Sequence, residues 1–196
     1  MQIQPPLPGL APPPSVAPSR QDRVFFAVML PADVARRARR LAWQLRDRLH
    51  LQAWPRNSRL FHISLFGFGE VGEVPPGLAA AAVKAASTIT LPPFEVTFDH
   101  VMSFGHPTRR PLVLLGGEGA AGVTRLERSL GEAMAKAGFR WTPGGYTPHV
   151  TLMYGEKDIG TCNCEPISWR VDGIELIHSL YGRSRYLTLA SCPLRG

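Results

Sequence analysis

Two short segments of this 196-residue chain share one arrangement of residues, and this repeat constrains the fold more than any other feature. The first segment reads FHISLFGFG from Phe61, and the second reads PHVTLMYG from Pro148. Each contains a histidine, an aliphatic residue, a hydroxyl residue and a leucine, and a segment with helical periodicity lies upstream of each. We interpret the repeat as two similar lobes that each contribute one strand carrying this motif.

The motif places its polar residues on one side of a strand. Because side chains alternate between the two faces of a β-strand, His62 and Ser64 share a face, and so do His149 and Thr151. The aliphatic residues between and after them face the opposite way, toward a core. Two lobes packed with the polar faces opposed would line one cleft with two imidazoles and two hydroxyls.

The remaining segments predict a mixture of strands and helices. Helical spacing of apolar residues is found over 31–50, 77–87 and 122–138. Short apolar or alternating runs that are typical of strands cover 23–30, 93–104, 111–116, 168–179 and 185–191. Because strands and helices do not alternate strictly, we predict an α+β fold. We expect two pseudo-symmetric lobes, each an antiparallel sheet with helices on the outside, around a central cleft.

The N-terminal region differs in composition from the rest. Residues 1–21 are rich in proline and have no periodic apolar face, so we predict a disordered tail before one bilobal domain over residues 22–196. The start of the chain lacks the basic and apolar regions of a secretory signal, and no apolar run is long enough to span a membrane. We therefore expect a cytoplasmic monomer without membrane contact.

The cysteines do not indicate a disulfide framework or a metal site. Their number is odd, which fits a reducing compartment. Cys162 and Cys164 are followed by His178 and Cys192, but the usual spacings of zinc ligands are absent. We expect no metal and no cofactor.

The charge of the chain favours anionic partners. Its 22 basic and 15 acidic residues give a net charge of +7, which suits nucleic acid, nucleotides or a membrane surface without choosing among them. Arginines fill the polar positions of the helix expected over 31–50, where a solvated helix face is the common reason and a nucleic-acid patch is the alternative. These residues are Arg36, Arg37, Arg39, Arg40, Arg46 and Arg48.

Two imidazoles and two hydroxyls in one cleft suit chemistry at a phosphate. A free histidine has a pKa of about 6.5, so one neutral imidazole can accept a proton while a charged one donates a proton. The hydroxyls can hydrogen-bond the non-bridging oxygens. In-line displacement at phosphorus needs a base and an acid on opposite sides, and a cyclic phosphodiester needs no metal if an acid protonates the departing oxygen.

The paired HISL and HVTL motifs resemble those of the two-histidine phosphoesterases, which include the bacterial 2′-5′ RNA ligase or RNA 2′,3′-cyclic phosphodiesterase (LigT-like) family. The resemblance covers roughly residues 23–194 and includes the opening RVFFAVMLP and the close HSLYGRSRYLTLASCPL. It implies that His62 and His149 are catalytic and that Ser64 and Thr151 bind phosphate. It also implies His62 as the acid that expels the ribose oxygen and His149 as the base that activates water.

One departure from the family pattern concerns substrate contacts. Many members carry a basic residue after the first leucine, where this chain has Phe66. The candidates for replacing that contact are Arg110, Arg183 and Arg185. In an unbroken strand Phe66 and Phe68 share the face of His62, which favours them for base stacking, whereas Tyr154 does not share the face of His149.

Three functions follow from these features. The first is an enzyme that opens 2′,3′-cyclic phosphates on RNA ends or nucleotides and leaves a 2′-phosphate. The second is ATP-independent joining of RNA ends through a 2′-5′ link, since the chain has no phosphate-binding G-x-x-x-x-G-K-[ST] loop and no K-x-D-G ligase motif. The third is a basic RNA-binding module without catalysis, whose binding would depend strongly on salt.

Overall fold

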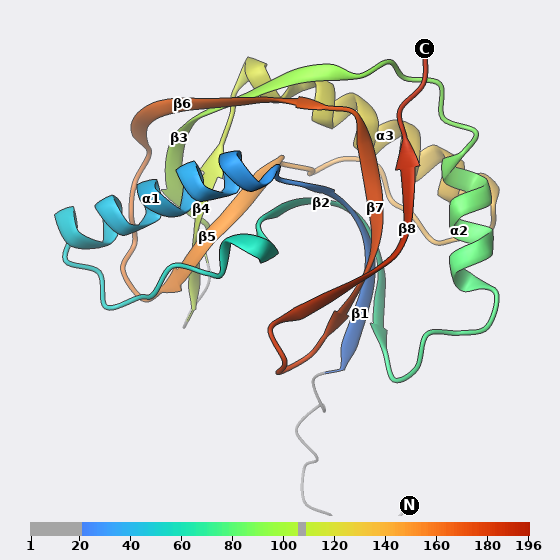
Figure 1. The fold of residues 1–196 in the computed structure, drawn as a ribbon, viewed down its shortest axis with the longest axis horizontal. Coiled ribbons are helices and arrows are strands. Elements are labelled where there is room, and N and C mark those ends of the chain that lie inside the picture. Colours follow the sequence, from blue (N-terminus) through green and yellow to red (C-terminus); the bar gives the residue numbers. More distant parts are fainter. Residues whose placement is uncertain (1–20, 106–108) are drawn as a thin grey trace, which may run out of the picture.

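The computed structural model describes residues 21–105 and 109–196, so the predicted proline-rich tail lies outside the described residues, apart from Gln21. The chain forms the predicted α+β fold, in which eight strands make one continuous sheet and are accompanied by three α-helices (Figure 1). The strands are β1 (Asp22–Met29), β2 (His62–Val71), β3 (Phe94–Ser103), β4 (Arg110–Leu115), β5 (His149–Gly155), β6 (Cys162–Val171), β7 (Gly173–Leu180) and β8 (Arg185–Pro193). The helices are α1 (Ala32–Arg48), α2 (Leu78–Ala86) and α3 (Ala121–Lys136), with short 3-10 turns η1 (Ser58–Leu60) and η2 (Glu118–Ala120).

The sheet consists of two antiparallel halves. Its strand order is β6-β3-β4-β5-β2-β1-β7-β8. The halves meet between β5 and β2, which pair at Ile63 and Val150. Figure 1 shows β3, β4 and β5 on the left and β1, β2, β7 and β8 on the right. The two motif strands are therefore the inner strands of the two halves.

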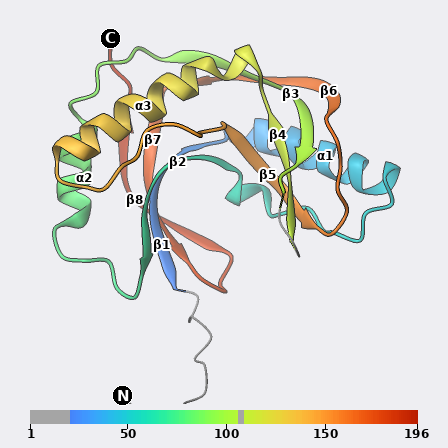
Figure 2. The same ribbon diagram turned by 180° about the vertical axis from the view of Figure 1, so that it is seen from behind.

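The connections within the halves repeat. Helix α1 connects β1 to β2, and α3 connects β4 to β5, so each motif strand follows a strand of its own half and then a helix. Helix α1 packs against β5 and β6 of the opposite half, while α3 packs against β2, β3 and α2. Figure 2 shows α3 above β2 and β7, and α1 beside β4 and β5. This exchange of helices ties the two halves together.

The helices form where the sequence supplies one apolar side. In α1 the buried residues follow helical spacing and form the side that packs on the sheet. Its first turn follows Pro31, whose missing N–H is not needed there, and its last turn carries basic residues that suit the negative end of the helix dipole. Among the described residues, no helix is long and apolar enough to cross a membrane.

The closing part of the chain has one strand more than the sequence indicated. The segment 168–179, interpreted as one strand, is divided between β6 and β7, with Asp172 between them. Strand β6 forms the edge of one half, whereas β7 pairs with β1 in the other. The periodic pattern could not show this crossover, because both strands bury apolar residues at alternate positions.

Both motif strands contain a β-bulge at the leucine of the motif. In β2, Ser64 pairs with Ala27 and Phe66 pairs with Phe26, so Leu65 has no partner on β1. In β5, Thr151 and Met153 pair with successive residues of β4, which leaves Leu152 without a partner. A bulge adds one residue to a strand and thereby reverses the face of every residue that follows.

Candidate functional site

The two motif histidines begin the two inner strands. The antiparallel pair Ile63 and Val150 sets the register, so the residues on either side of it place His62 across from Thr151 and Ser64 across from His149. In this arrangement the two histidines are diagonal neighbours, whose Cβ atoms are typically about 7–8 Å apart. The structure thus brings the two predicted histidine and hydroxyl pairs together on adjacent strands of one sheet, rather than on two opposed sheets.

Both imidazoles are held in the same way. Nδ1 of His62 donates a hydrogen bond of 2.8 Å to the carbonyl oxygen of Leu60, and Nδ1 of His149 donates one of 2.8 Å to that of Thr147. A carbonyl oxygen can only accept, so the proton of each neutral imidazole resides on Nδ1. The lone pair of each Nε2 is therefore available for a hydrogen bond or a proton.

The Nε2 atoms have different surroundings. Nε2 of His62 accepts a hydrogen bond from the hydroxyl of Ser64 at 3.0 Å. Within the described parts of the chain, no residue forms a hydrogen bond with Nε2 of His149. Ser64 is exposed, and His62, His149 and Thr151 are half-buried. The side chains are thus fixed by the protein and still accessible from solvent.

Aromatic rings surround the histidines. The ring of His62 lies 5.1 Å from that of Phe25 and 5.5 Å from that of Tyr186, and His149 has Phe104 at 4.8 Å. Burial lowers the pKa of His62 to about 4, and although its bond to Leu60 acts in the opposite direction, the charges of Arg56 and His149 lower the pKa further. His62 is therefore neutral at pH 7 in the free protein.

Arg56 is a site residue that the sequence analysis missed. Its guanidinium donates to the hydroxyl of Tyr154 at 3.1 Å and to that of Tyr186 at 3.3 Å. Because these hydroxyls accept from Arg56, their own protons remain available for an anion. Burial, chiefly, raises the pKa of Tyr186 and keeps it protonated. A cation and two hydroxyl donors thus lie beside His62.

The position of Arg56 depends on a connection that local sequence does not reveal. Its backbone N–H donates to the carbonyl oxygen of Leu152 at 2.8 Å, and the preceding Pro55 forms an isolated bridge with Met153. The loop after α1 therefore runs along β5, in the half of the sheet opposite to β2. An arginine in a loop carries no periodic signal, and nothing in the sequence around it indicates this pairing.

The predictions for the aromatic residues of the motif strands were wrong. Phe66 is 7% exposed and pairs with the core residue Phe26. Phe68 packs on Phe26, Phe66 and Phe139, with ring centroids 5.0–6.0 Å away. Both face the core because the bulge at Leu65 reverses the strand. The matching bulge at Leu152 has the opposite effect on Tyr154, whose hydroxyl lies next to Arg56.

The three arginines named as substitutes for the missing basic residue lie apart from the histidines. Arg110 begins β4 and forms an ion pair with Asp158 at 3.1 Å. Arg183 lies in the turn between β7 and β8, and Arg185 is exposed at the start of β8. The structure records no contact between any of the three and His62 or His149 within the described residues. Arg56, by contrast, contacts Tyr186, whose ring lies 5.5 Å from that of His62.

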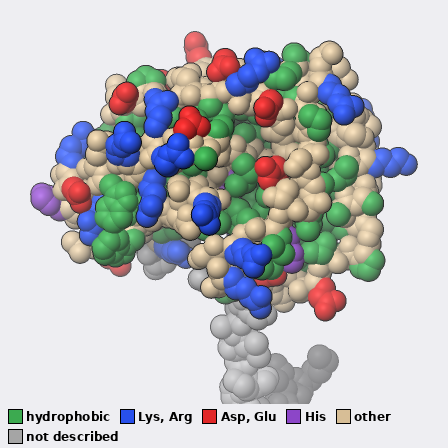
Figure 3. Space-filling model, in the orientation of Figure 1, with side chains coloured by type: hydrophobic (Ala, Val, Ile, Leu, Met, Phe, Trp, Pro, Cys, Tyr) green, Lys and Arg blue, Asp and Glu red, His purple; other side chains and the backbone are tan. Residues whose placement is uncertain are grey.

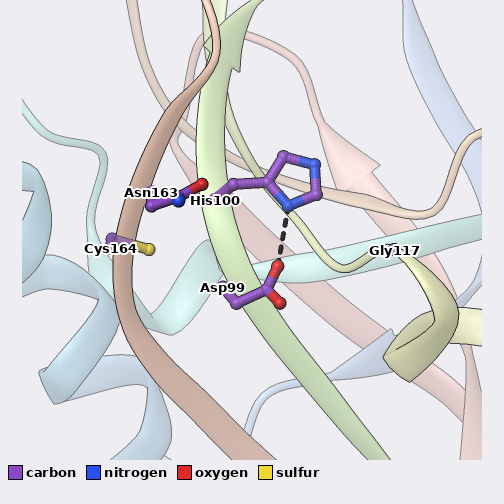
Figure 4. Close-up of a pocket in the computed structure, with 5 residues that line it drawn as sticks. All are labelled: Asp99, His100, Gly117, Asn163 and Cys164. Atoms are coloured by element: carbon purple, nitrogen blue, oxygen red, sulfur yellow. Dashed lines mark hydrogen bonds and ion pairs between the residues drawn. The ribbon is translucent and has the colours of Figure 1, made fainter.

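Two cavities in the described part of the chain are lined by neither His62 nor His149. One of about 320 Å³ lies where β3 and β6 meet, lined by Asp99, His100, Gly117, Asn163 and Cys164 (Figure 4). Nδ1 of His100 donates to the Asp99 carboxylate there at 2.7 Å, and burial raises the pKa of the Cys164 thiol. The second, of about 440 Å³, lies beyond Tyr154, at the end of β5. Among the described residues, no three His, Cys, Asp or Glu side chains are grouped to hold a metal ion.

Comparison with known proteins gives one set of relatives by sequence and another by structure. An RNA 2′,3′-cyclic phosphodiesterase of Archaeoglobus fulgidus is 33% identical over 91 residues, which are 46% of this chain and 49% of that protein. The match thus spans about half the length of this curated relative. A crystal structure of a phosphoesterase superposes with a TM-score of 0.71 at 22% identity, covering 90% of this chain and 99% of that one.

Structures of LigT from E. coli share the fold. The apo form gives a TM-score of 0.70 at 24% identity, with 91% of this chain and 100% of that chain covered. The complex with 3′-AMP gives a TM-score of 0.70 at 22% identity, with 89% of this chain and 99% of that chain covered. The family model for the 2′-5′ RNA ligase superfamily matches residues 30–183, a span that includes both motif strands and the helices α1, α2 and α3. With that match over most of its length, this chain belongs to the 2′-5′ RNA ligase superfamily.

Proposed function

We propose that the protein is a metal-independent RNA 2′,3′-cyclic phosphodiesterase that uses His62 and His149 as an acid–base pair. The observation that carries the proposal is that both imidazoles are held in one tautomer by backbone carbonyls, on adjacent strands of one face. The curated relative is itself an RNA 2′,3′-cyclic phosphodiesterase, which supports the same reaction.

The reaction requires two proton transfers. Water attacks phosphorus while His149 accepts its proton, the bond from phosphorus to the 3′-oxygen breaks, and His62 gives that oxygen a proton. The product carries a 2′-phosphate, and the histidines have exchanged protonation states. Ser64 and Thr151 donate hydrogen bonds to the non-bridging oxygens, whose negative charge grows in the transition state.

In the same proposal, Arg56 binds the phosphate. It takes the place of the basic residue that many relatives carry after the first leucine, and binds the phosphate together with the hydroxyls of Tyr154 and Tyr186. A guanidinium that is already fixed by two hydroxyls loses little freedom when the phosphate binds. This role is supported by its hydrogen bonds of 3.1 and 3.3 Å and by its effect on the pKa of His62.

The test is a panel of nucleoside 2′,3′-cyclic phosphates and oligoribonucleotides with cyclic-phosphate ends. We expect turnover of the cyclic substrates, products in which the 2′-oxygen keeps the phosphate, and no loss of rate with EDTA. Products with a 3′-phosphate would contradict the proposed geometry of attack. Salt-dependent binding of the oligoribonucleotides without turnover would indicate a non-catalytic RNA-binding module.

The family to which the chain belongs also favours a second reaction. The same site can join ends if a ribose 5′-hydroxyl replaces water as the nucleophile and forms a 2′-5′ link without ATP. Incubation of half-molecules with cyclic-phosphate and 5′-hydroxyl ends, followed by gel separation, distinguishes the joined product from the opened phosphate.

A further inference from the structure

Two tryptophans outside the histidine site form an exposed aromatic cluster. Trp54 is 69% exposed, and its ring meets that of Trp43 on α1 edge to face, with centroids 5.5 Å apart. The guanidinium of Arg46 lies over both rings, 4.5 Å from the centre of Trp54 and 5.3 Å from that of Trp43. Its Nε also donates to the carbonyl oxygen of Ala53 at 3.1 Å. We call Trp43, Arg46 and Trp54 the tryptophan platform.

The platform continues along α1 as a basic surface. Arg36, Arg40 and Trp43 are spaced four and three residues apart, so they lie along one side of the helix, with Arg39 next to them. This side is opposite to the buried face of α1. Arg36, Arg39 and Arg40 are exposed and form no ion pair with any described residue. Figure 3 shows Lys and Arg side chains gathered over the region of α1.

The platform lies close to the proposed catalytic site along the chain. Trp54 precedes Arg56 by two residues in the extended segment that runs along β5, a separation of about 7 Å. Arg56 in turn donates to Tyr186, whose ring contacts that of His62. An RNA strand that runs from the histidines past Arg56 therefore reaches Trp54 within a few nucleotides.

We infer that the tryptophan platform and the basic side of α1 bind the single-stranded RNA that precedes the reactive phosphate. An exposed indole offers a face for stacking to any base, and unpaired arginines beside it suit the phosphates of a flexible strand. A membrane or an acidic protein could use the charge, but neither requires an aromatic ring presented beside a phosphate site. The inference rests on the proposed function and extends it, because it assigns oligonucleotides rather than mononucleotides as the preferred substrates.

The test compares substrates of different length in variants of the platform. In Trp54→Ala we expect kcat/KM for a cyclic-ended oligoribonucleotide to fall by roughly tenfold, the worth of one stacked base, while the value for a nucleoside 2′,3′-cyclic phosphate stays unchanged. Trp54→Phe should restore most of the loss. Arg40→Gln should weaken oligonucleotide binding and reduce its salt dependence, whereas Arg125→Gln, an equal loss of charge at an exposed position of α3, should change neither.

A binding measurement separates this inference from the proposed reaction. Fluorescence anisotropy with a labelled single-stranded oligoribonucleotide reports on the platform even if no cyclic substrate is hydrolysed. Wild-type affinity in both Trp54→Ala and Arg40→Gln would overturn the inference, whatever the hydrolysis assays show. An equal loss of kcat/KM for the mononucleotide and the oligonucleotide in Trp54→Ala would also overturn it. Retention on anionic vesicles with wild-type RNA binding by the variants would assign the surface to a membrane instead.

Discussion

The imidazole of His62 has a lower pKa than that of an exposed histidine, and this bears on its proposed role as an acid. A proton donor must be charged, but burial and the nearby Arg56 lower its pKa to about 4. The negative charge of a bound phosphate favours the imidazolium and acts in the opposite direction. The proposed acid role therefore requires that substrate binding itself promote protonation of His62.

We expect an NMR titration of free protein to show that His62 gains its proton only near pH 4. Between about pH 4 and pH 6.5, an ordinary histidine would already be charged while His62 stays neutral. Saturation with a nucleoside 2′-phosphate should raise its pKa, because the imidazolium then faces an anion. A pKa that stays near 4 in the complex would contradict the acid role and favour His62 as the base.

Replacement of Arg56 tests the cation of the site. We expect Arg56→Gln to lower kcat/KM for a nucleoside 2′,3′-cyclic phosphate by about 10- to 100-fold, the worth of a charged hydrogen bond to the phosphate. It should also raise the pKa of His62, since a neighbouring positive charge is removed. Arg59→Gln is the matched control, because Arg59 is exposed in the neighbouring turn η1 and carries the same charge. Equal effects of the two variants would leave Arg56 without a specific role.

At the scale of elements, the motif strands show what sequence periodicity can and cannot reveal. The alternation of residues placed His62 with Ser64 and His149 with Thr151, because these residues precede the bulges. It failed for Phe66, because the bulge at the intervening leucine turns the strand over. A bulge depends on pairing with the neighbouring strand, so local pattern does not record it.

The loop between α3 and β5 is held at both ends, and this fixes the start of the second motif strand. The hydroxyl of Tyr146 donates to the carbonyl oxygen of Ser64 at 2.9 Å, which joins the loop to β2. At the other end, the indole of Trp141 lies against Gly131 of α3 and donates to Glu127 at 3.3 Å. A methyl group at Gly131 would overlap this ring.

We therefore expect Gly131→Ala to destabilise the protein by about 1–3 kcal/mol, the usual cost of overpacking, although alanine favours helices. Urea unfolding would measure the change. Gly72→Ala is the control, since a Cβ there meets no atom within 4 Å and the backbone is not left-handed. If the free energy of unfolding of Gly131→Ala is equal to or higher than that of the wild type, the ring of Trp141 is free to move away.

For the whole molecule, the repeated motif was enough to predict two similar halves, and the order of elements agreed with the structure apart from the division of segment 168–179 into β6 and β7. What the sequence could not show is how the halves exchange their helices. It also could not show that a loop of one half pairs with β5 of the other and brings Arg56 to His62. These are contacts between distant residues, which depend on the completed fold.

The central claim is that His62 and His149, one from each half, act on the same phosphorus atom. The most direct measurement is the rate of hydrolysis of a nucleoside 2′,3′-cyclic phosphate by the wild type, His62→Ala, His149→Ala and the double variant. We expect each single variant to lose about 10²–10⁴-fold in kcat, and the double variant to be little slower than the slower single one, because the two residues act as a unit. A single variant that keeps the wild-type rate would contradict the claim, and so would a double variant whose loss equals the product of the single losses.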